Sequence, residues 1–265
     1  VTSNAVGLSL VYAPVIGQSP SGVTVWQGQS GSFEVVVSGG TAPYDYQWFK
    51  NGVALAGKTD ASLSFGSVAG GDAGTYTVRV SNLGGSVTSA GGVLTVAVAP
   101  AVVKQPVATS VGLLGSGSLS VVASGSGPLS YQWYKDGVAL SGKTGSVLAL
   151  SSAVKGDEGM YKVEVSNTFV GETRKVESVE ARLTVVEPAV IGEQPVGIEV
   201  WEGGGGTLKT VVSGGTAPFG YQWYRNGVAV AGATKAELVL SGLKGAQAGN
   251  YTVRVSNLGG VVESG

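Results

Sequence analysis

The sequence predicts an all-β protein built from three tandem β-sandwiches, and three observations lead to this expectation. Its 265 residues are 43% hydrophobic and only 12% charged, a composition that allows a buried core. Its 45 glycines lie among many Val, Ser and Thr residues, as expected for short strands joined by turns. Two sequence blocks recur at nearly constant spacing, which organises the strands into repeats.

The first recurring block centres on a Trp. Residues 46–53 read YQWFKNGV, and close copies follow 85 and then 90 residues further on, at 131–138 and 221–228. A second block shows the same two spacings, at residues 74–82, 159–167 and 249–257. Two blocks in one register indicate true repeats, and a period of this length suits independent domains rather than the shorter units of a solenoid.

Within each repeat, alternating apolar and polar residues predict short β-strands. In the first repeat the Asn51-Gly52 pair predicts a tight hairpin after the Trp strand, because both residues tolerate positive φ. About seven short strands in a repeat is the pattern of a two-sheet sandwich. The strands most clearly marked in the first repeat are residues 33–37, 46–50, 63–65, 76–80 and 94–98.

The repeats resemble the immunoglobulin-like superfamily, in particular its intermediate-type set and the tandem copies found in very long bacterial surface proteins. The resemblance covers nearly the whole chain and rests on a Trp in the third strand and a downstream Asp-x-Gly-x-Tyr. It implies a core around the Trp and a tyrosine corner, a Tyr whose hydroxyl caps the backbone, in each repeat. The core residues so implied are Trp48, Trp133, Trp223, Tyr76, Tyr161 and Tyr251.

Two positions depart from the family pattern. The family joins strands B and F by a disulfide, but this chain has no Cys. The matching pairs are Val35 with Val78, Val121 with Val163, and Thr210 with Val253. An aliphatic pair can fill that space, whereas the hydroxyl of Thr210 needs a partner. The other departure is Gln247, which replaces the motif Asp in a repeat that also lacks a Lys; we therefore expect edge ion pairs between Lys58 and Asp72 and between Lys143 and Asp157.

The repeat register divides the chain into four segments. We expect three domains, at residues 14–99, 100–187 and 188–265, and we expect residues 1–13 to be the last (G) strand of a preceding or neighbouring domain. The third domain lacks a G strand of its own. Two explanations stay open: the chain is a window from a longer array, or residues 1–13 of one copy complete the third domain of the next by strand addition. The residues of this assembly strand are Val6, Leu8, Leu10 and Tyr12.

Composition argues against most chemistry. Cys and His are absent, which removes thiol nucleophiles and the side chains that usually bind transition metals, so no enzyme activity, cofactor or metal site is expected. Calcium stays open at the second linker, where Glu187 and Glu193 could supply oxygen ligands, although solvated linker charges are the preferred interpretation. A formal charge of −1 without a basic stripe argues against nucleic acid as a partner. The longest nearly apolar run, residues 91–103, is too short to span a bilayer, so no membrane insertion is expected.

Three aromatic residues are candidates for contacts outside their own core. Trp26 and Trp201 each follow an alternating strand on its outward side, where the second repeat has Val111. Such a Trp can pack against the adjoining domain, which is the preferred interpretation, or stack on a sugar or protein partner. Phe169 lies near the tip of an enlarged hairpin, residues 168–180, at an end of the sandwich where many such domains carry recognition loops.

Taken together, these features predict a structural or adhesive segment located outside the cell or at its surface. It would form an extended rod or a head-to-tail filament, with other copies or adjoining repeats of the same protein as its partners. The alternative is a carbohydrate- or protein-binding surface module that recognises a cell-surface glycan or protein.

Overall fold

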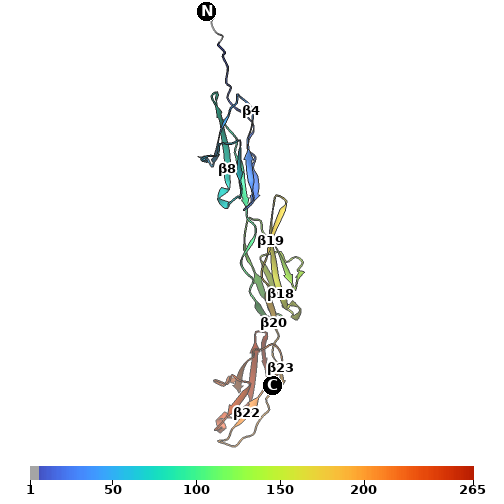
Figure 1. Cartoon of the computed structure of the whole chain (residues 1–265). Helices are drawn as coiled ribbons and strands as arrows, with labels where there is room; N and C mark the ends of the chain where they lie inside the picture. Colours follow the sequence, from blue (N-terminus) through green and yellow to red (C-terminus); the bar gives the residue numbers. More distant parts are fainter. Residues whose placement is uncertain (1–5) are drawn as a thin grey trace, which may run out of the picture. The chain divides into compact units, whose positions relative to one another are not determined.

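The structure, a computed structural model, describes residues 6–265 (Figure 1). Within that range the regular elements are strands and three short 3-10 turns, namely η1 (Gly70–Asp72), η2 (Lys155–Asp157) and η3 (Gly245–Gln247). No helix in the described chain is long and apolar enough to cross a membrane. The predicted all-β fold of tandem immunoglobulin-like sandwiches is confirmed.

The first sandwich has ten strands: β1 (Val15–Gln18), β2 (Val23–Trp26), β3 (Gly31–Glu34), β4 (Val36–Gly39), β5 (Asp45–Lys50), β6 (Val53–Ala54), β7 (Ser62–Phe65), β8 (Gly74–Asn82), β9 (Gly85–Thr88) and β10 (Gly92–Ala97). Its larger sheet has the order β2–β10–β8–β5–β6, with β9 paired to β8. The opposite layer contains the pairs β1–β4 and β3–β7. Side chains from the two layers meet in the core.

The second sandwich repeats this plan with ten strands: β11 (Ala101–Lys104), β12 (Thr109–Gly112), β13 (Gly117–Ser120), β14 (Val122–Ser124), β15 (Ser130–Lys135), β16 (Val138–Ala139), β17 (Val147–Leu150), β18 (Gly159–Phe169), β19 (Glu172–Glu177) and β20 (Ala181–Val186). The large sheet has the order β12–β20–β18–β15–β16, and β19 pairs with β18. The opposite layer contains the pairs β11–β14 and β13–β17.

The third sandwich has eight strands: β21 (Val190–Glu193), β22 (Gly206–Lys209), β23 (Val211–Gly214), β24 (Gly220–Arg225), β25 (Val228–Ala229), β26 (Glu237–Leu240), β27 (Tyr251–Asn257) and β28 (Gly260–Glu263). Its large sheet is reduced to the order β25–β24–β27–β28. Nothing here corresponds to β2 and β10 of the first sandwich, and residues 194–201 form no strand.

The described chain packs as two compact units, which do not coincide with the three sandwiches. One unit contains the first sandwich together with two turns of the second, Ser124–Ser130 and Ser166–Val176. The other unit contains the rest of the second sandwich and the third. Two loops of the second sandwich therefore belong by packing to the first sandwich.

A buried Trp lies at the centre of each core. Trp48, Trp133 and Trp223 have no exposed surface. Each indole N–H donates a 2.9 Å hydrogen bond to a backbone carbonyl twelve residues ahead, on Asp60, Gly145 and Lys235 respectively. Because a buried N–H without a partner costs about 1–3 kcal/mol, this bond lets a large amphipathic ring occupy the core without that loss.

The positions that match the family disulfide are buried and apolar in the first two sandwiches. In the third, Thr210 takes the corresponding place and is also buried. Its hydroxyl donates a 3.0 Å hydrogen bond to the carbonyl of Glu193. The polar group therefore has the partner that burial requires.

Each sandwich has a tyrosine corner. The hydroxyls of Tyr76, Tyr161 and Tyr251 donate to the carbonyls of Asp72, Asp157 and Gln247 at 2.6, 2.7 and 2.8 Å. The acceptor lies four residues earlier, at the end of the 3-10 turn, so the bond fixes the turn to strand F, which is β8, β18 or β27 in the three sandwiches. The first two Tyr are fully buried, whereas Tyr251 is partly exposed.

The expected ion pairs at this turn are wrong. Within residues 6–265 no ion pair joins Lys58 to Asp72 or Lys143 to Asp157. Asp72 and Asp157 accept the N–H of Ala69 and Val154, the residues directly before their own 3-10 turns, at 2.8 Å. Gln247 accepts the N–H of Lys244 in the same way, at 3.0 Å. The position requires an acceptor oxygen and no charge, which explains why Gln can replace Asp.

Burial of the Tyr161 hydroxyl, with the nearby charges of Asp157 and Asp136, raises the pKa of Tyr161 to about 12. The folded chain keeps this phenol neutral at pH values above 10, where the unfolded chain would ionise it. The resulting stability is present below pH 10 and is lost as the pH rises through about 12. We expect the native chain to be more stable than Tyr161→Phe by about 0.5–1.5 kcal/mol at neutral pH, with the difference shrinking toward pH 12 in urea unfolding.

A matched control for this experiment is Tyr46→Phe, because the Tyr46 hydroxyl makes no hydrogen bond within the described chain. It should unfold like the native chain at neutral pH. A Tyr161→Phe difference that stays constant across the alkaline range would contradict the assignment.

Candidate functional site

The last strand of the first two sandwiches lies between two others. In the first, β10 pairs in parallel with β2 and antiparallel with β8, and Leu94 stands opposite both Val23 and Gly74. In the second, Leu183 stands opposite Thr109 and Gly159 in the same register. Both Leu side chains are buried. This G strand therefore closes the core and is the only link between the strands on either side of it in the large sheet.

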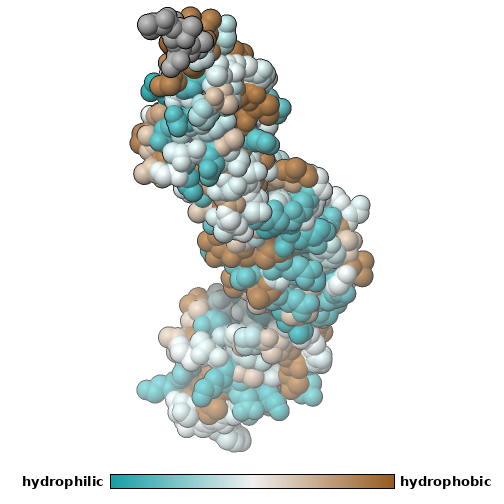
Figure 2. Space-filling model, turned by 45° about the horizontal axis from the view of Figure 1, so that its top comes forward, coloured by the Kyte–Doolittle hydropathy of each residue, from teal (hydrophilic) through white to brown (hydrophobic). Residues whose placement is uncertain are grey.

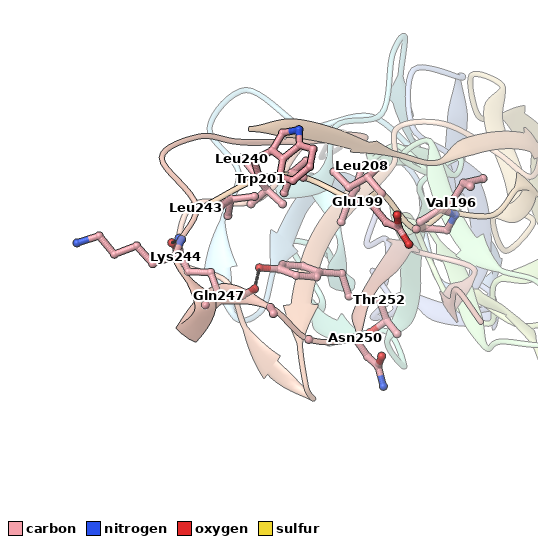
Figure 3. Close-up of a pocket in the computed structure, with 18 of the residues that line it drawn as sticks. Val196, Glu199, Trp201, Leu208, Leu240, Leu243, Lys244, Gln247, Asn250 and Thr252 are labelled. Atoms are coloured by element: carbon pink, nitrogen blue, oxygen red, sulfur yellow. Dashed lines mark hydrogen bonds between the residues drawn. The ribbon is translucent and has the colours of Figure 1, made fainter. Parts of the chain in front are cut away.

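The third sandwich has an open groove at this position. The groove has a volume of about 850 Å³ and lies between residues 195–202 and the start of β27. In Figure 3, Trp201, Leu240 and Leu208 lie on one side of it, and the bonded pair of Gln247 and a Tyr hydroxyl lies on another. We call it the G-strand groove; its principal lining residues are Ile198, Val200, Trp201, Leu208, Leu240 and Tyr251.

The exposure of the groove residues shows what the G strand covers elsewhere. Val25 and Tyr76 are buried in the first sandwich. Their counterparts in the third, Val200 and Tyr251, are partly exposed. The groove is thus a core surface without its cover, not a polar cleft shaped for a small substrate.

Residues 6–13 form no strand and extend from the first sandwich (Figure 1). The four predicted assembly residues, Val6, Leu8, Leu10 and Tyr12, are exposed, Leu8 to 92%. Hydrophobic residues are visible at this end of the described chain in Figure 2. The prediction for residues 1–13 also covers residues 1–5, which lie outside the described residues.

The linker before each sandwich is held by a set of hydrogen bonds that sequence reasoning missed. Tyr12 donates its N–H to the Thr41 hydroxyl at 3.0 Å, and its carbonyl accepts the N–H of Thr41 at 3.0 Å and the side-chain amide of Asn82 at 2.8 Å. The same amide also donates to the carbonyl of Thr41 at 2.7 Å. We call these three residues a linker clasp.

The clasp recurs at the other two linkers. Its members there are Val98, Ser126 and Asn167, and Glu187, Thr216 and Asn257. Val98 and Glu187 directly follow the last strands β10 and β20. The clasp satisfies both backbone groups of the linker residue, so it fixes the point where one sandwich's last strand passes to the next sandwich. The recurring Asn of the second sequence block was the signal for it.

Trp26 is packed, with an exposed fraction of 2%. Within one compact unit its ring meets Phe169 edge to face, with centroids 5.4 Å apart, and the guanidinium of Arg174 lies 4.5 Å from the ring centroid. Trp201 differs completely, since it is 91% exposed.

Val111 was expected to be the counterpart of these Trp residues in the second repeat, and this prediction is wrong by one position. The register of β2 and β12 against their G strands aligns Val111 with Val25, and Gly112 with Trp26. A Trp therefore alternates with Gly, not with Val, at the end of this strand.

The enlarged hairpin is formed by β18 and β19 (Figure 1). Its turn at Val170 and Gly171 has positive φ at both residues, 52° and 75°. Lys162 and Glu177 form a cross-strand ion pair at 2.7 Å, and Arg174 and Glu172, both on β19, form an ion pair at 3.0 Å. The pair with Glu172 helps to hold the Arg174 guanidinium over the Trp26 ring.

Residues 6–265 contain no group of three or more His, Cys, Asp or Glu side chains that could hold a metal ion. The candidate site consists of the apolar G-strand groove and the hydrogen-bonded linkers.

This geometry defines a class, that of tandem immunoglobulin-like domains. A family model described as "Immunoglobulin domain" matches residues 13–82. Hemicentin-2 of the mouse (Mus musculus) is 33% identical over 178 residues, which cover 64% of this chain and 3% of hemicentin-2. The chain therefore spans only a small part of that relative.

Solved structures agree with this class. An I-band fragment of titin matches with a TM-score of 0.61 at 23% identity, covering 95% of this chain and 96% of the fragment. A complex of Dpr2 with DIP-Theta matches with a TM-score of 0.53 at 18% identity, covering 95% and 97%. These likenesses show the fold alone. The bacterial part of the resemblance finds no support, because hemicentin-2 is an animal protein.

The clasp can be tested at Asn167, which is buried and donates to two carbonyls. We expect Asn167→Ala to lower the free energy of unfolding by about 1–3 kcal/mol, because the two carbonyls lose a partner. Hydrogen exchange followed by mass spectrometry should show faster exchange at the amide of Ser126, which donates to Val98. Asn250→Ala, at an exposed side chain that points away from the groove in Figure 3, is the control and should leave exchange unchanged.

Proposed function

We propose that this chain is a structural and adhesive segment of a protein outside the cell or at its surface, whose sandwiches join head to tail. The observation that carries the proposal is the G-strand groove of the third sandwich, together with an exposed segment of G-strand sequence at residues 6–13. A strand in the groove would pair on both sides and cover apolar surface, which is recognition by strand addition. The extracellular location rests on the resemblance to repeats of large surface proteins.

The register of the added strand follows from the first two sandwiches. Leu8 has the place of Leu94 and Leu183 in the repeat, so it would stand opposite Gly249 and Ile198. Leu10 would then lie beside Val200. Complete burial of a Leu contributes about 1.5–3 kcal/mol, and the strand would add backbone hydrogen bonds.

Val6 is the residue of the assembly strand that replaces a glycine of the first sandwich, so its side chain tests whether the strand fits the G-strand groove. Its counterpart in the first sandwich is Gly92, where a Cβ would lie 2.9 Å from the carbonyl of Pro20 and 3.0 Å from the ring of Phe33. The third sandwich has Leu208 in the place of Phe33. The second sandwich has Leu in that place as well, and there the strand residue is the larger Ala181. Leu208 thus removes the ring contact that a Val at this place would meet in the first sandwich.

The clasp supports the same arrangement. Tyr12 occupies on the first sandwich the place that Val98 and Glu187 occupy on the next two. Val98 and Glu187 each come directly after a G strand. A strand formed by residues 6–11 would therefore enter the clasp of the first sandwich just as the internal strands enter theirs, and assembly would continue the array.

Sedimentation velocity over a range of concentrations tests the proposal. We expect the 265-residue chain to self-associate, and we expect the double variant Leu8→Arg, Leu10→Arg to stay monomeric, because a charge cannot enter the core. A groove variant, Ile198→Arg, should also stay monomeric. Mixing the two variants should restore dimers only, since each keeps one intact end.

Val53→Arg is the matched control for these variants. Val53 is exposed, lies in β6 and has no part in the groove or the assembly strand, so this variant should associate like the native chain. A native chain that remains monomeric at every concentration would overturn association through residues 6–13.

Recognition of a sugar or an unrelated protein is the second candidate, and the exposure of Trp201 is the observation that favours it. Trp26 packs against Phe169 and is 2% exposed, so it has no free ring face for a ligand. We expect any glycan-array signal of the chain to survive Trp26→Phe and to disappear in Trp201→Ala. A signal that survives Trp201→Ala would remove this candidate.

A further inference from the structure

Trp26 and Trp201 occupy the same place in the sequence repeat, yet their surroundings are opposite. Each lies five residues before the glycine that begins the next strand, Gly31 and Gly206. Trp26 is 2% exposed and Trp201 is 91% exposed. Two things differ around the ring: Trp26 ends a paired strand and is covered, whereas residues 194–201 form no strand and nothing in the described chain covers Trp201.

The cover over Trp26 is the long F–G hairpin of the second sandwich. Phe169 meets the ring edge to face, and Arg174 lies over its face. The hairpin reaches this far because it is longer than its counterpart in the first sandwich: 24 residues separate Gly159 from Leu183, against 20 between Gly74 and Leu94. Aromatic edge contacts and a guanidinium over an indole are both favourable, each by about 0.5–2 kcal/mol.

The second sandwich has Gly112 where the others have Trp, and it meets a different partner. Within the second compact unit a Cβ on Gly112 would lie 2.5 Å from the carbonyl of Leu258, in the short F–G turn of the third sandwich. A Cβ on Gly259 of the same turn would collide with the carbonyl of Val186. Backbone therefore packs directly on backbone here, which only glycine allows.

Two kinds of joint exist in the chain: a Trp under a long hairpin and a glycine under a short turn. We propose that Trp201 is the docking residue for a further immunoglobulin-like sandwich that resembles the second sandwich of this chain. Its long F–G hairpin would present an aromatic ring and an Arg to Trp201, as Phe169 and Arg174 do to Trp26. This inference rests on the proposed function only in that a G strand fills the groove. It adds the kind of sandwich that must follow the G strand in the chain.

The inference also ranks another copy of this chain as the poorer partner. A copy joined through residues 6–13 would bring its first sandwich to the groove, and the F–G turn of that sandwich is the short one at Leu83 and Gly84. A short turn without an aromatic residue leaves Trp201 uncovered. The turn at Leu83 and Gly84 instead fits a preceding sandwich that has glycine at the end of its β12-like strand, as the turn at Leu258 fits Gly112.

Two extended chains test the inference. In the first, residues 91–187 are appended after Gly265, so that the added G strand leads into a second sandwich with its long hairpin. In the second, residues 180–265 are appended, so that the added G strand leads into a third sandwich with its short turn. Hydroxyl-radical footprinting with mass spectrometry then reports the oxidation of Trp201 in each chain.

We expect Trp201 in the first extended chain to be oxidised as slowly as Trp26, and Trp201 in the second to keep the fast rate of the parent chain. Replacing the appended copies of Phe169 and Arg174 with Ala should return Trp201 to the fast rate. Equal oxidation of Trp201 in the two extended chains would overturn the inference.

The same samples separate this inference from the proposed function. Hydrogen exchange of residues 195–202 should slow in both extended chains, because both supply a G strand. If it slows in neither, strand addition to the groove fails. If it slows in both while Trp201 stays exposed in the first, strand addition holds and the pairing of Trp with the long hairpin is wrong.

Discussion

The G strand is the element on which the rest of the structure depends. In the first two sandwiches it pairs with a strand on each side, and its Leu closes the core. In the third sandwich, where the described chain has no such strand, residues 194–201 form no strand either, although Ile198 and Val200 keep the alternating pattern. The neighbouring strand therefore exists only when the G strand pairs with it. Strand propensity alone does not produce it.

A chain without Cys stabilises its cores by giving the polar groups at the core centres a hydrogen-bond partner, although the Trp26 indole N–H and the Asn167 side-chain oxygen are buried without one in the described chain. The indole N–H of each central Trp, the hydroxyl of Thr210 and the tyrosine-corner hydroxyls all donate to backbone carbonyls. These bonds are local or cross a single sandwich, so each domain is specified by its own residues. The clasps apply the same chemistry to the linkers, where a backbone N–H and carbonyl would otherwise be left to solvent.

The sequence was sufficient to predict the fold, because period-two alternation and repeated blocks report local geometry. The Trp of the third strand and the Tyr of the second block likewise lie where a repeated sandwich needs them. It was not sufficient for the clasp, because Asn82 lies 41 residues from Thr41 and 70 from Tyr12. The role of Asp72 was misjudged for a related reason: a carboxylate near a Lys suggests an ion pair, but the carboxylate of Asp72 accepts the N–H of Ala69, three residues before it in the chain. The one-residue error at Val111 arose because the strand is short and its ends carry no alternation.

Two differences of the second sandwich are best understood together. Its F–G hairpin is longer than the others, and its strand β12 ends in glycine where the first and third sandwiches have Trp. The hairpin acts on the sandwich before it, whereas the glycine acts on the sandwich after it. The second sandwich thus contributes the long hairpin to one joint and the glycine to the other. Neither feature has a role inside the core of the second sandwich. Size matching at the joints, a long hairpin on an indole and a tight turn on a glycine, would then discriminate between neighbours that share the same strand and the same clasp. In this way a repeat protein whose domains are nearly identical inside can still specify the order in which they follow one another.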